Sequence, residues 1–248
     1  MLALSLLLTT ALVSAAAPVP VDPPPRDGEA LIRQMRERYH GRWYETLTFV
    51  QKTTLPNGKV ETWYEALAAP GRLRIDIAPL DSMRTLIFRD DSLFEFRGGH
   101  RVAARHLIHP LMVLGFDVYV QPEEVTIGKL RRLGFDLSRL HETTWQGRPT
   151  YVVGAVAGDS TTRQFWIDKE RLYFVRSLEP APQDPSKVAE TRFEDYREMG
   201  GGWLEHEVVF LLNGEVRMRE EYGDTRVRVP LDSALFRTDA WTAPTWIK

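Results

Sequence analysis

The sequence predicts a mainly β fold of the α+β class: one antiparallel sheet of about ten or eleven strands that curls as a barrel or half-barrel, with two or three helices. Three observations support this prediction. Polar and apolar residues alternate with a period of two through most of residues 42–101 and again through 149–229. Short turn segments separate the alternating runs. The helical segments lie before or between groups of strands, so βαβ units and a parallel sheet are not expected.

The first 17 residues have the composition of a secretory signal peptide. They are apolar, too short to span a bilayer comfortably, and contain Val13-Ser14-Ala15 as the preferred cleavage site. The positively charged n-region that usually begins a signal peptide is missing, because no Lys or Arg precedes Arg26. A buried N-terminal helix is the alternative, which the following prolines disfavour. We expect export to the periplasm, a spacer at residues 18–27 that holds five prolines, and one domain over 28–248.

Composition excludes several classes of protein. A chain of 248 residues that is 43% hydrophobic can build a sizeable core. The formal net charge of -2 offers no basic surplus for nucleic-acid binding. Cysteine is absent, which excludes disulfides, Cys-ligated metal and a lipidated cysteine. No later segment is long and apolar enough to cross a membrane, so we expect a soluble mature protein without stable membrane insertion.

Capping and turn residues define the first elements. Asp27 can cap a helix through about Tyr39, with Ile32 and Met35 on its apolar stripe and Gly41 where it stops. The next segments, 42–54 and 60–70, read as a hairpin whose Asn57-Gly58 suits a type I′ turn.

The following strands also alternate. Residues 72–77 place Leu73, Ile75 and Ile77 on one face and three charged residues on the other. Residues 84–97 read as a further hairpin, with 89–92 in its loop.

Alternation lapses between about Val102 and Glu142. Pro122 suits a first helical turn and Gly134 a stop, which predicts a helix between them. Residues 104–120 are strongly apolar but broken by Pro110, which predicts a short helix and a loop that pack over something. Strands are then predicted at 149–158, 161–168, 171–179, 189–199, 202–214 and 215–229.

No residue pattern singles out a catalytic or metal site. His106 and His109 have the spacing of two ligands on one helix face, but Pro110 follows and no HExxH surrounds them, so solvated or capping histidines are preferred. His206, between two glutamates, is expected on a wet sheet face. No GxSxG, cysteine or SxxK places a nucleophile beside a base. A hydrolase site built from two carboxylates remains an alternative, because only the separation of the two groups in space is diagnostic. No cofactor and no metal are expected.

Aromatic residues are the main functional signal. Seven Trp, eleven Phe and eight Tyr, mostly on strands, exceed what one face of a small sheet needs. The hairpin at 163–177 carries large apolar residues on both faces, although an antiparallel hairpin normally wets one. Either helices cover the sheet and these residues are core, or a curved sheet with incomplete cover leaves an apolar cavity for acyl chains. The candidate lining residues, each on an alternating face, are Phe49, Leu73, Ile75, Leu86, Phe88, Phe94, Phe96, Phe165 and Ile167.

Four stretches carry a family resemblance by their order and spacing. They are "ALIRQMRERYHGRWYETLTFVQKTT", in which Phe49 and Gln51 match an F-x-Q pattern, then "EALAAPGRLRIDI", "TLIFRDDSLFEF" and "VRVPLDSALFRTD". Together they resemble the LolA/LolB-like lipoprotein-localisation fold, and more closely the outer-membrane lipoprotein-sorting proteins. The resemblance covers nearly the whole mature chain. It implies an unclosed, strongly curved sheet, a half-barrel, with helices as a lid over an apolar cavity on its concave face.

The resemblance implies a function as well as a fold. Carrier members take lipoprotein acyl chains from an inner-membrane transporter and pass them to an outer-membrane acceptor, without catalysis. This sequence departs from them in two places. Carriers bear an arginine, which holds the lid shut, before the proline of the strand pair, whereas Ala69 precedes Pro70 here. The segment from about His100 to Glu142 is also longer than in compact carriers.

The expected function is therefore a periplasmic carrier that sequesters acyl chains of a lipid or lipoprotein. Two alternatives remain open at this point: an envelope-stress sensor or regulatory protein-interaction domain of the same fold, and a hydrolase of envelope polymers.

Overall fold

The computed structural model describes residues 23–247, so the proposed signal peptide and the first part of the spacer lie outside the described residues. The helices are α1 (Gly28–Tyr39), α2 (Pro110–Gly115) and α3 (Glu123–Arg132), with 3-10 turns η1 (Leu80–Ser82), η2 (Asp117–Tyr119) and η3 (Ser233–Phe236). The strands are β1 (Thr46–Thr54), β2 (Val60–Ala68), β3 (Arg72–Ile77), β4 (Arg84–Arg89), β5 (Ser92–Arg97), β6 (His100–His106), β7 (Leu140–Trp145), β8 (Arg148–Val153), β9 (Gln164–Asp168), β10 (Phe174–Ala181), β11 (Asp184–Glu194), β12 (Arg197–Met199), β13 (Gly202–Leu204), β14 (Glu207–Leu212) and β15 (Glu215–Val227).

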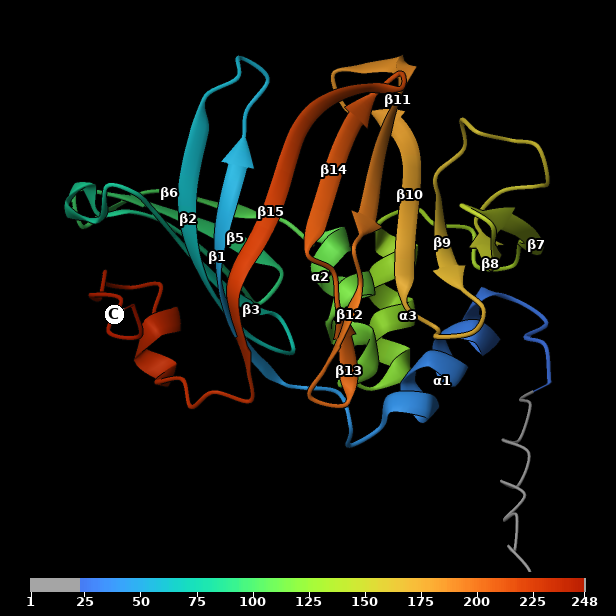
Figure 1. The fold of residues 1–248 in the computed structure, drawn as a ribbon, viewed down its shortest axis with the longest axis horizontal. Coiled ribbons are helices and arrows are strands. Elements are labelled where there is room, and N and C mark those ends of the chain that lie inside the picture. The colour runs from blue at the N-terminus through green and yellow to red at the C-terminus, as the bar shows by residue number, and fades with distance from the viewer. Residues whose placement is uncertain (1–22, 248) are drawn as a thin grey trace, which may run out of the picture.

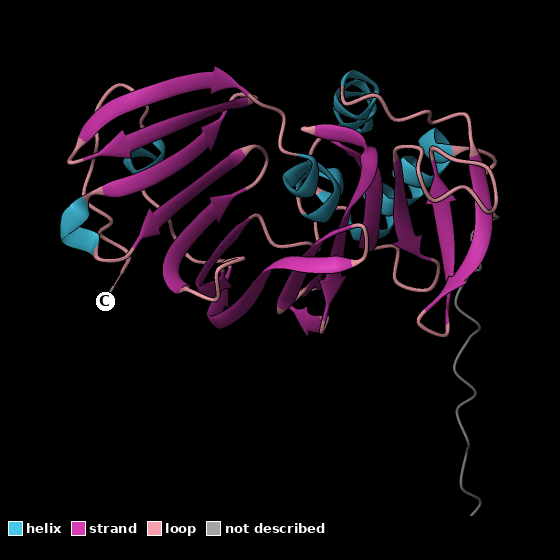
Figure 2. Cartoon of the chain, turned by 90° about the horizontal axis from the view of Figure 1, so that it is seen from above, coloured by secondary structure: helices cyan, strands magenta, loops and turns pink. Residues whose placement is uncertain are grey.

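The main sheet is antiparallel and is not closed into a barrel. It has thirteen strands in the order β6-β5-β4-β3-β2-β1-β15-β14-β11-β10-β9-β8-β7, and β6 and β7 are its two edges. The first and last long strands, β1 and β15, pair at its centre. The sheet curls around α1, α2 and α3 (Figures 1 and 2). The predicted class and the curled, unclosed sheet are confirmed.

The predicted number of strands was too low. β6 and β7 were missed because they lie at the two ends of the segment where alternation lapses. Strands at a sheet edge are more exposed to solvent and need no apolar stripe, and every residue of β6 is exposed. The predicted strands 189–199 and 202–214 are each divided, and their ends pair as the separate hairpin β12–β13. His206 lies at this break and is buried, so its expected place on a wet face was wrong.

The two tight hairpins differ from the predicted turn chemistry. Asn57 does not take the positive φ that a type I′ turn needs; only Gly58 does, at 79°, and its N–H donates to the Leu55 carbonyl over 2.9 Å. The β1–β2 loop is therefore a longer one. At the β4–β5 turn both Asp90 and Asp91 have φ of 53°, the type I′ signature, since Asp tolerates this region.

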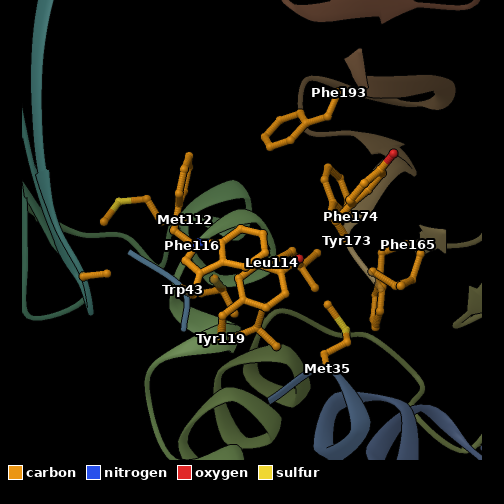
Figure 3. Packing of buried hydrophobic residues seen from close by; sticks show 14 of the residues in the cluster. Met35, Trp43, Met112, Leu114, Phe116, Tyr119, Phe165, Tyr173, Phe174 and Phe193 are labelled. Atoms are coloured by element: carbon orange, nitrogen blue, oxygen red, sulfur yellow. The ribbon is translucent and has the colours of Figure 1, made fainter. Parts of the chain in front are cut away.

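Helix α1 forms where the sequence predicts it. The Asp27 carboxylate accepts the Ala30 N–H at 2.8 Å, and the predicted stripe of Ile32 and Met35 is fully buried. Trp43, just after the helix, stacks on Tyr119 of η2 with ring centroids 3.6 Å apart (Figure 3). This aromatic contact joins α1 to the segment between α2 and α3.

The C-terminal segment covers the outer face of strands β2 to β4. Arg74 is fully buried there and pairs with Asp76 through Nε–Oδ2 at 2.7 Å and Nη2–Oδ1 at 2.9 Å. The same guanidinium donates to the carbonyls of Leu235 and Thr242. The polar face of β3 is thus buried too, and its charges hold residues 231–246 against the sheet.

Among the described residues no helix has the length and apolar character needed to span a bilayer.

Candidate functional site

An apolar cavity of about 360 Å³ lies between the concave face of the sheet and the segment around α2. Its volume is at the lower end of the range of roughly 300–1,000 Å³ for ligand pockets. The sheet contributes Phe49, Gln51, Trp63, Glu65, Leu67, Leu73, Ile75, Leu86, Phe88, Leu93, Arg105, Phe193, Phe210, Met218, Glu220 and Tyr222, and the covering segment contributes Leu107, His109, Leu111, Met112 and Phe116. We refer to residues 107–133, which include α2, η2 and α3, as the lid.

Strand register explains why apolar side chains converge here. Leu73 pairs with Phe88 and Ile75 with Leu86, so these two strands present a continuous apolar surface inward. Phe116 and Met112 approach from the lid, and Phe193 of β11 lies opposite them (Figure 3). The cavity exists because the sheet curves away from the short α2, which does not fill the concave side.

Five of the predicted lining residues lie around this cavity: Phe49, Leu73, Ile75, Leu86 and Phe88. Because they lie on β1, β3 and β4 and all face inward, simple alternation was sufficient to find them.

Phe94 and Phe96 do not lie around this cavity. The Asp90-Asp91 turn pairs Phe88 with Leu93, and so it is Leu93 that faces inward. Phe94 pairs with Ile87 and therefore points to the outer face. One residue of register exchanges the two faces of a strand, and the turn length that fixes this register was not evident from the alternation of β5 alone.

Phe165 and Ile167 lie elsewhere, in the core between β9 and the helices. Both are fully buried, and Phe165 makes an edge contact with Phe135 at 5.2 Å. On the other face of this hairpin the Arg176 guanidinium lies between Trp145 and Trp166, at 4.1 and 4.6 Å from the ring centroids. The two-sided apolar hairpin is thus covered by protein on both faces.

Sequence reasoning missed the polar residues of the cavity, above all Gln51, Glu65, Glu220 and Tyr222. Glu65 shares its parity with Trp63 and Leu67, both of which line the cavity, so the alternation of β2 could have placed it inside. It was passed over because a glutamate on a strand is normally solvated.

The two cavity glutamates are buried. Glu65 is 4% exposed and Glu220 is 8% exposed. Burial, with Glu220 nearby, raises the pKa of Glu65 well above its ordinary value. Burial also raises the pKa of Glu220 to about 7, although the Tyr222 hydroxyl donates to its Oε2 at 3.2 Å. At a pKa of about 7, Glu220 is about half protonated at neutral pH, and burial shifts Glu65 toward its protonated form as well, so the cavity wall carries less charge than two solvated glutamates would.

The lid is fastened to the sheet by acidic groups. The Asp117 carboxylate accepts the Gly71 N–H at 2.9 Å, at the turn after Ala69-Pro70, and burial raises its pKa to about 6. Asp91 of the β4–β5 turn pairs with Lys129 of α3 at 2.7 Å. The first contact fastens the lid at the turn after Ala69-Pro70, and the second fastens it at the β4–β5 turn.

The mouth of the cavity has a different character from its interior. Arg105 lies on edge strand β6 with its side chain 62% exposed, 3.7 Å from Glu95. His109 caps α2 through the Met112 N–H, as expected for a capping histidine, and burial lowers its pKa to about 4. His109 is therefore neutral near pH 7.

A second hollow, also about 360 Å³, lies near the ends of β8, β10 and β11. Its lining mixes charged and aromatic side chains, and two of the charged residues, Arg148 and Asp168, form an ion pair at 2.7 Å. The cavity under the lid has a mostly apolar lining. It is therefore the better candidate for binding an apolar ligand.

Comparisons with known proteins point to one fold. No protein-family model matches the sequence, and no curated protein matches it. A DUF1329-family protein from Desulfovibrio piger matches with a TM-score of 0.56 and 14% identity, over 86% of this chain and 96% of that one. A domain named for outer membrane lipoprotein sorting, from Vibrio parahaemolyticus, matches with a TM-score of 0.55 and 12% identity, over 86% and 97%. A LolA-superfamily protein from Nitrosomonas europaea matches with a TM-score of 0.50 and 12% identity, over 86% and 98%. The chain has structural similarity to these domains, and at such low identity the likeness concerns the fold.

Proposed function

We propose that this LolA-like domain is a carrier that binds acyl chains in the cavity under the lid. The observation that carries the proposal is the apolar cavity itself, lined on the sheet side by residues such as Leu73 and Ile75 and closed by α2. The fold shared with domains named for lipoprotein sorting supports it. The carrier acts by reversible sequestration, and no step of catalysis is part of the proposal.

The energetics are sufficient for transport through water. Each methylene buried in an apolar cavity contributes about 0.8 kcal/mol. A long saturated chain therefore gains roughly 10 kcal/mol before the cost of association. A carrier that binds this strongly needs a receiver with a comparable site, because release otherwise limits transfer.

The cellular setting follows from the same proposal. With residues 1–17 as a signal peptide, the mature protein is periplasmic and moves a lipid or lipoprotein between an inner-membrane donor and an outer-membrane acceptor. The absence of a spanning helix from the described residues is compatible with a shuttle.

A hydrolase is less well supported by the same cavity. Glu65 and Glu220 are close enough for the charge of one to raise the pKa of the other. Glycoside hydrolysis needs one ionised carboxylate beside one protonated carboxyl in a polar cleft. Here burial raises the pKa of both, and the walls around them are apolar. A cavity filled by side chains would favour the sensor alternative. Here the cavity is not filled, which favours the carrier.

Retention of a fluorescent fatty acid tests the proposal. The double variant Leu73→Asp/Ile75→Asp places two charges on the cavity floor and is expected to abolish retention. Val216→Asp, at a position that is 53% exposed, is the matched control and is expected to retain the probe. If the double variant unfolds, Leu86→Trp at a half-buried lining position fills space instead, and is expected to weaken retention at least tenfold. Wild-type retention by a folded Leu86→Trp protein would contradict the proposal.

A further inference from the structure

We propose that the ligand of this cavity carries an aliphatic ammonium group, which binds in the part of the cavity lined by Glu65 and Glu220, against the aromatic side chains around them. The inference rests on the proposed function, since it names the polar end of the amphiphile whose chain the cavity takes.

The acids lie on the sheet side of the cavity, on strands β2 and β15 that flank β1. Glu65 pairs across β1–β2 with Phe49, and Glu220 pairs across β1–β15 with Thr53. In the described part of the chain no hydrogen-bond donor reaches the Glu65 carboxyl, whereas Glu220 has the side chains of Tyr222, at 3.2 Å, and Gln51 as donors. A buried carboxyl without donors is costly, and a ligand that supplies them removes that cost.

Aromatic rings surround the same part of the cavity. Phe49 and Tyr222 lie with ring centroids 4.4 Å apart, and Trp63 is next to Gln51 on the neighbouring strand. Phe210 of β14 completes this group among the lining residues. Ring faces attract ammonium groups, and carboxylates combined with aromatic rings are a common way to recognise them.

The positive charges of the cavity lie away from the acids. Arg105 is the one basic side chain among the lining residues apart from His109, and it lies at the mouth beside Glu95. His109 is neutral near pH 7 because burial lowers its pKa. The interior thus offers acidic groups without a buried counter-ion. A bound ammonium group favours the ionised form of these carboxyls, which burial alone shifts toward protonation, and in an apolar surrounding the resulting ion pair is stronger than in water.

The same arrangement disfavours an anionic head inside. A carboxylate head would meet two acids and no buried cation, so it would have to remain at the mouth near Arg105. A neutral hydroxyl head would gain hydrogen bonds but no ion pair. Three amphiphiles of equal chain length therefore separate the possibilities.

The experiment is competition of decylamine, decanol and decanoate against N-phenyl-1-naphthylamine, an uncharged apolar probe, at pH 8, below micelle-forming concentrations. An alkylammonium stays charged at this pH, as lysine does. For the wild-type protein we expect decylamine to bind at least tenfold more tightly than decanol, and decanoate more weakly than both. In Glu65→Gln/Glu220→Gln we expect the advantage of the amine to fall below twofold while the affinity of decanol is unchanged.

The control is Glu221→Gln, which removes a neighbouring carboxylate from an exposed position of β15 and is expected to keep the preference for the amine. Equal affinity of amine and alcohol in the wild type, or a preference that survives the double substitution, would overturn the inference while the proposed function stands. Preference for decanoate would also overturn it and would assign the head to Arg105. Failure of all three compounds to displace the probe, or of the probe to bind, would overturn the proposed function and this inference with it.

Discussion

Glu220→Gln is expected to make the protein more stable at alkaline pH and to leave its stability nearly unchanged at acid pH. Burial raises the pKa of Glu220 from its ordinary 4.5 to about 7. Between these values the folded protein binds a proton that the unfolded chain has released, so the free energy of unfolding falls as the pH rises through this window. At about 1.4 kcal/mol per pKa unit, the loss by pH 8 is about 3 kcal/mol.

Glutamine keeps the shape of the protonated carboxyl and cannot ionise, so the variant does not incur this loss. The assay is urea unfolding of the wild type and Glu220→Gln at pH 4.5 and pH 8. We expect a difference near zero at pH 4.5 and about 3 kcal/mol in favour of the variant at pH 8. Glu65 and Glu205, whose pKa values burial also raises, are present in both proteins, and the charge of Glu220 contributes to both shifts; the difference therefore measures Glu220 together with its coupling to these two acids. Glu221→Gln serves as the exposed control, and a stability difference that does not change with pH would refute the reasoning.

Two further substitutions test the fastening of the C-terminal segment and of the lid. Arg74→Met leaves Asp76 buried and unpaired, and is expected to lower stability by about 3–5 kcal/mol and to speed hydrogen exchange in residues 231–246; slow exchange there would contradict the role given to the pair. Asp117→Ala removes the acceptor of the Gly71 N–H and is expected to cost about 1–3 kcal/mol and to speed release of a bound probe. Asp117→Asn keeps an acceptor oxygen and is expected to release the probe at the wild-type rate. Equal release rates for the alanine and asparagine variants would mean that the contact does not hold the lid.

Elements whose signals lie within a few neighbouring residues could be predicted from the sequence. Helix α1 has its cap, stripe and stop within a few residues, and β3 has strict alternation, so both could be predicted closely. The inward residues of β1, β3 and β4 were also found, since their parity could be read from each strand alone.

The remaining errors arise where a contact between distant segments decides the outcome. The parity of β5 depends on the two-residue turn at Asp90-Asp91. The burial of Arg74 depends on a C-terminal segment more than 150 residues away along the chain, as its contact with Leu235 shows. Phe165 and Ile167 alternate as lining residues would, but both are fully buried in the core, where Phe165 packs against Phe135.

The acids of the cavity were missed for a related reason. Whether Glu65 faces water or a cavity depends on the curvature of the whole sheet and on the lid. Neither feature can be predicted from the sequence of β2 alone. The alternation of β2 places Glu65 on the correct face of the strand. Only the three-dimensional structure shows that this face is shielded from solvent.

A chain-length series of neutral alcohols tests most directly whether the cavity under the lid takes an alkyl chain. Displacement of a fluorescent probe by hexanol, octanol, decanol and dodecanol yields an affinity for each. Because a buried methylene contributes about 0.8 kcal/mol, we expect the affinity to rise about fourfold with each added methylene until the cavity is filled. Affinity that does not depend on chain length, in a protein that binds the probe, would contradict it.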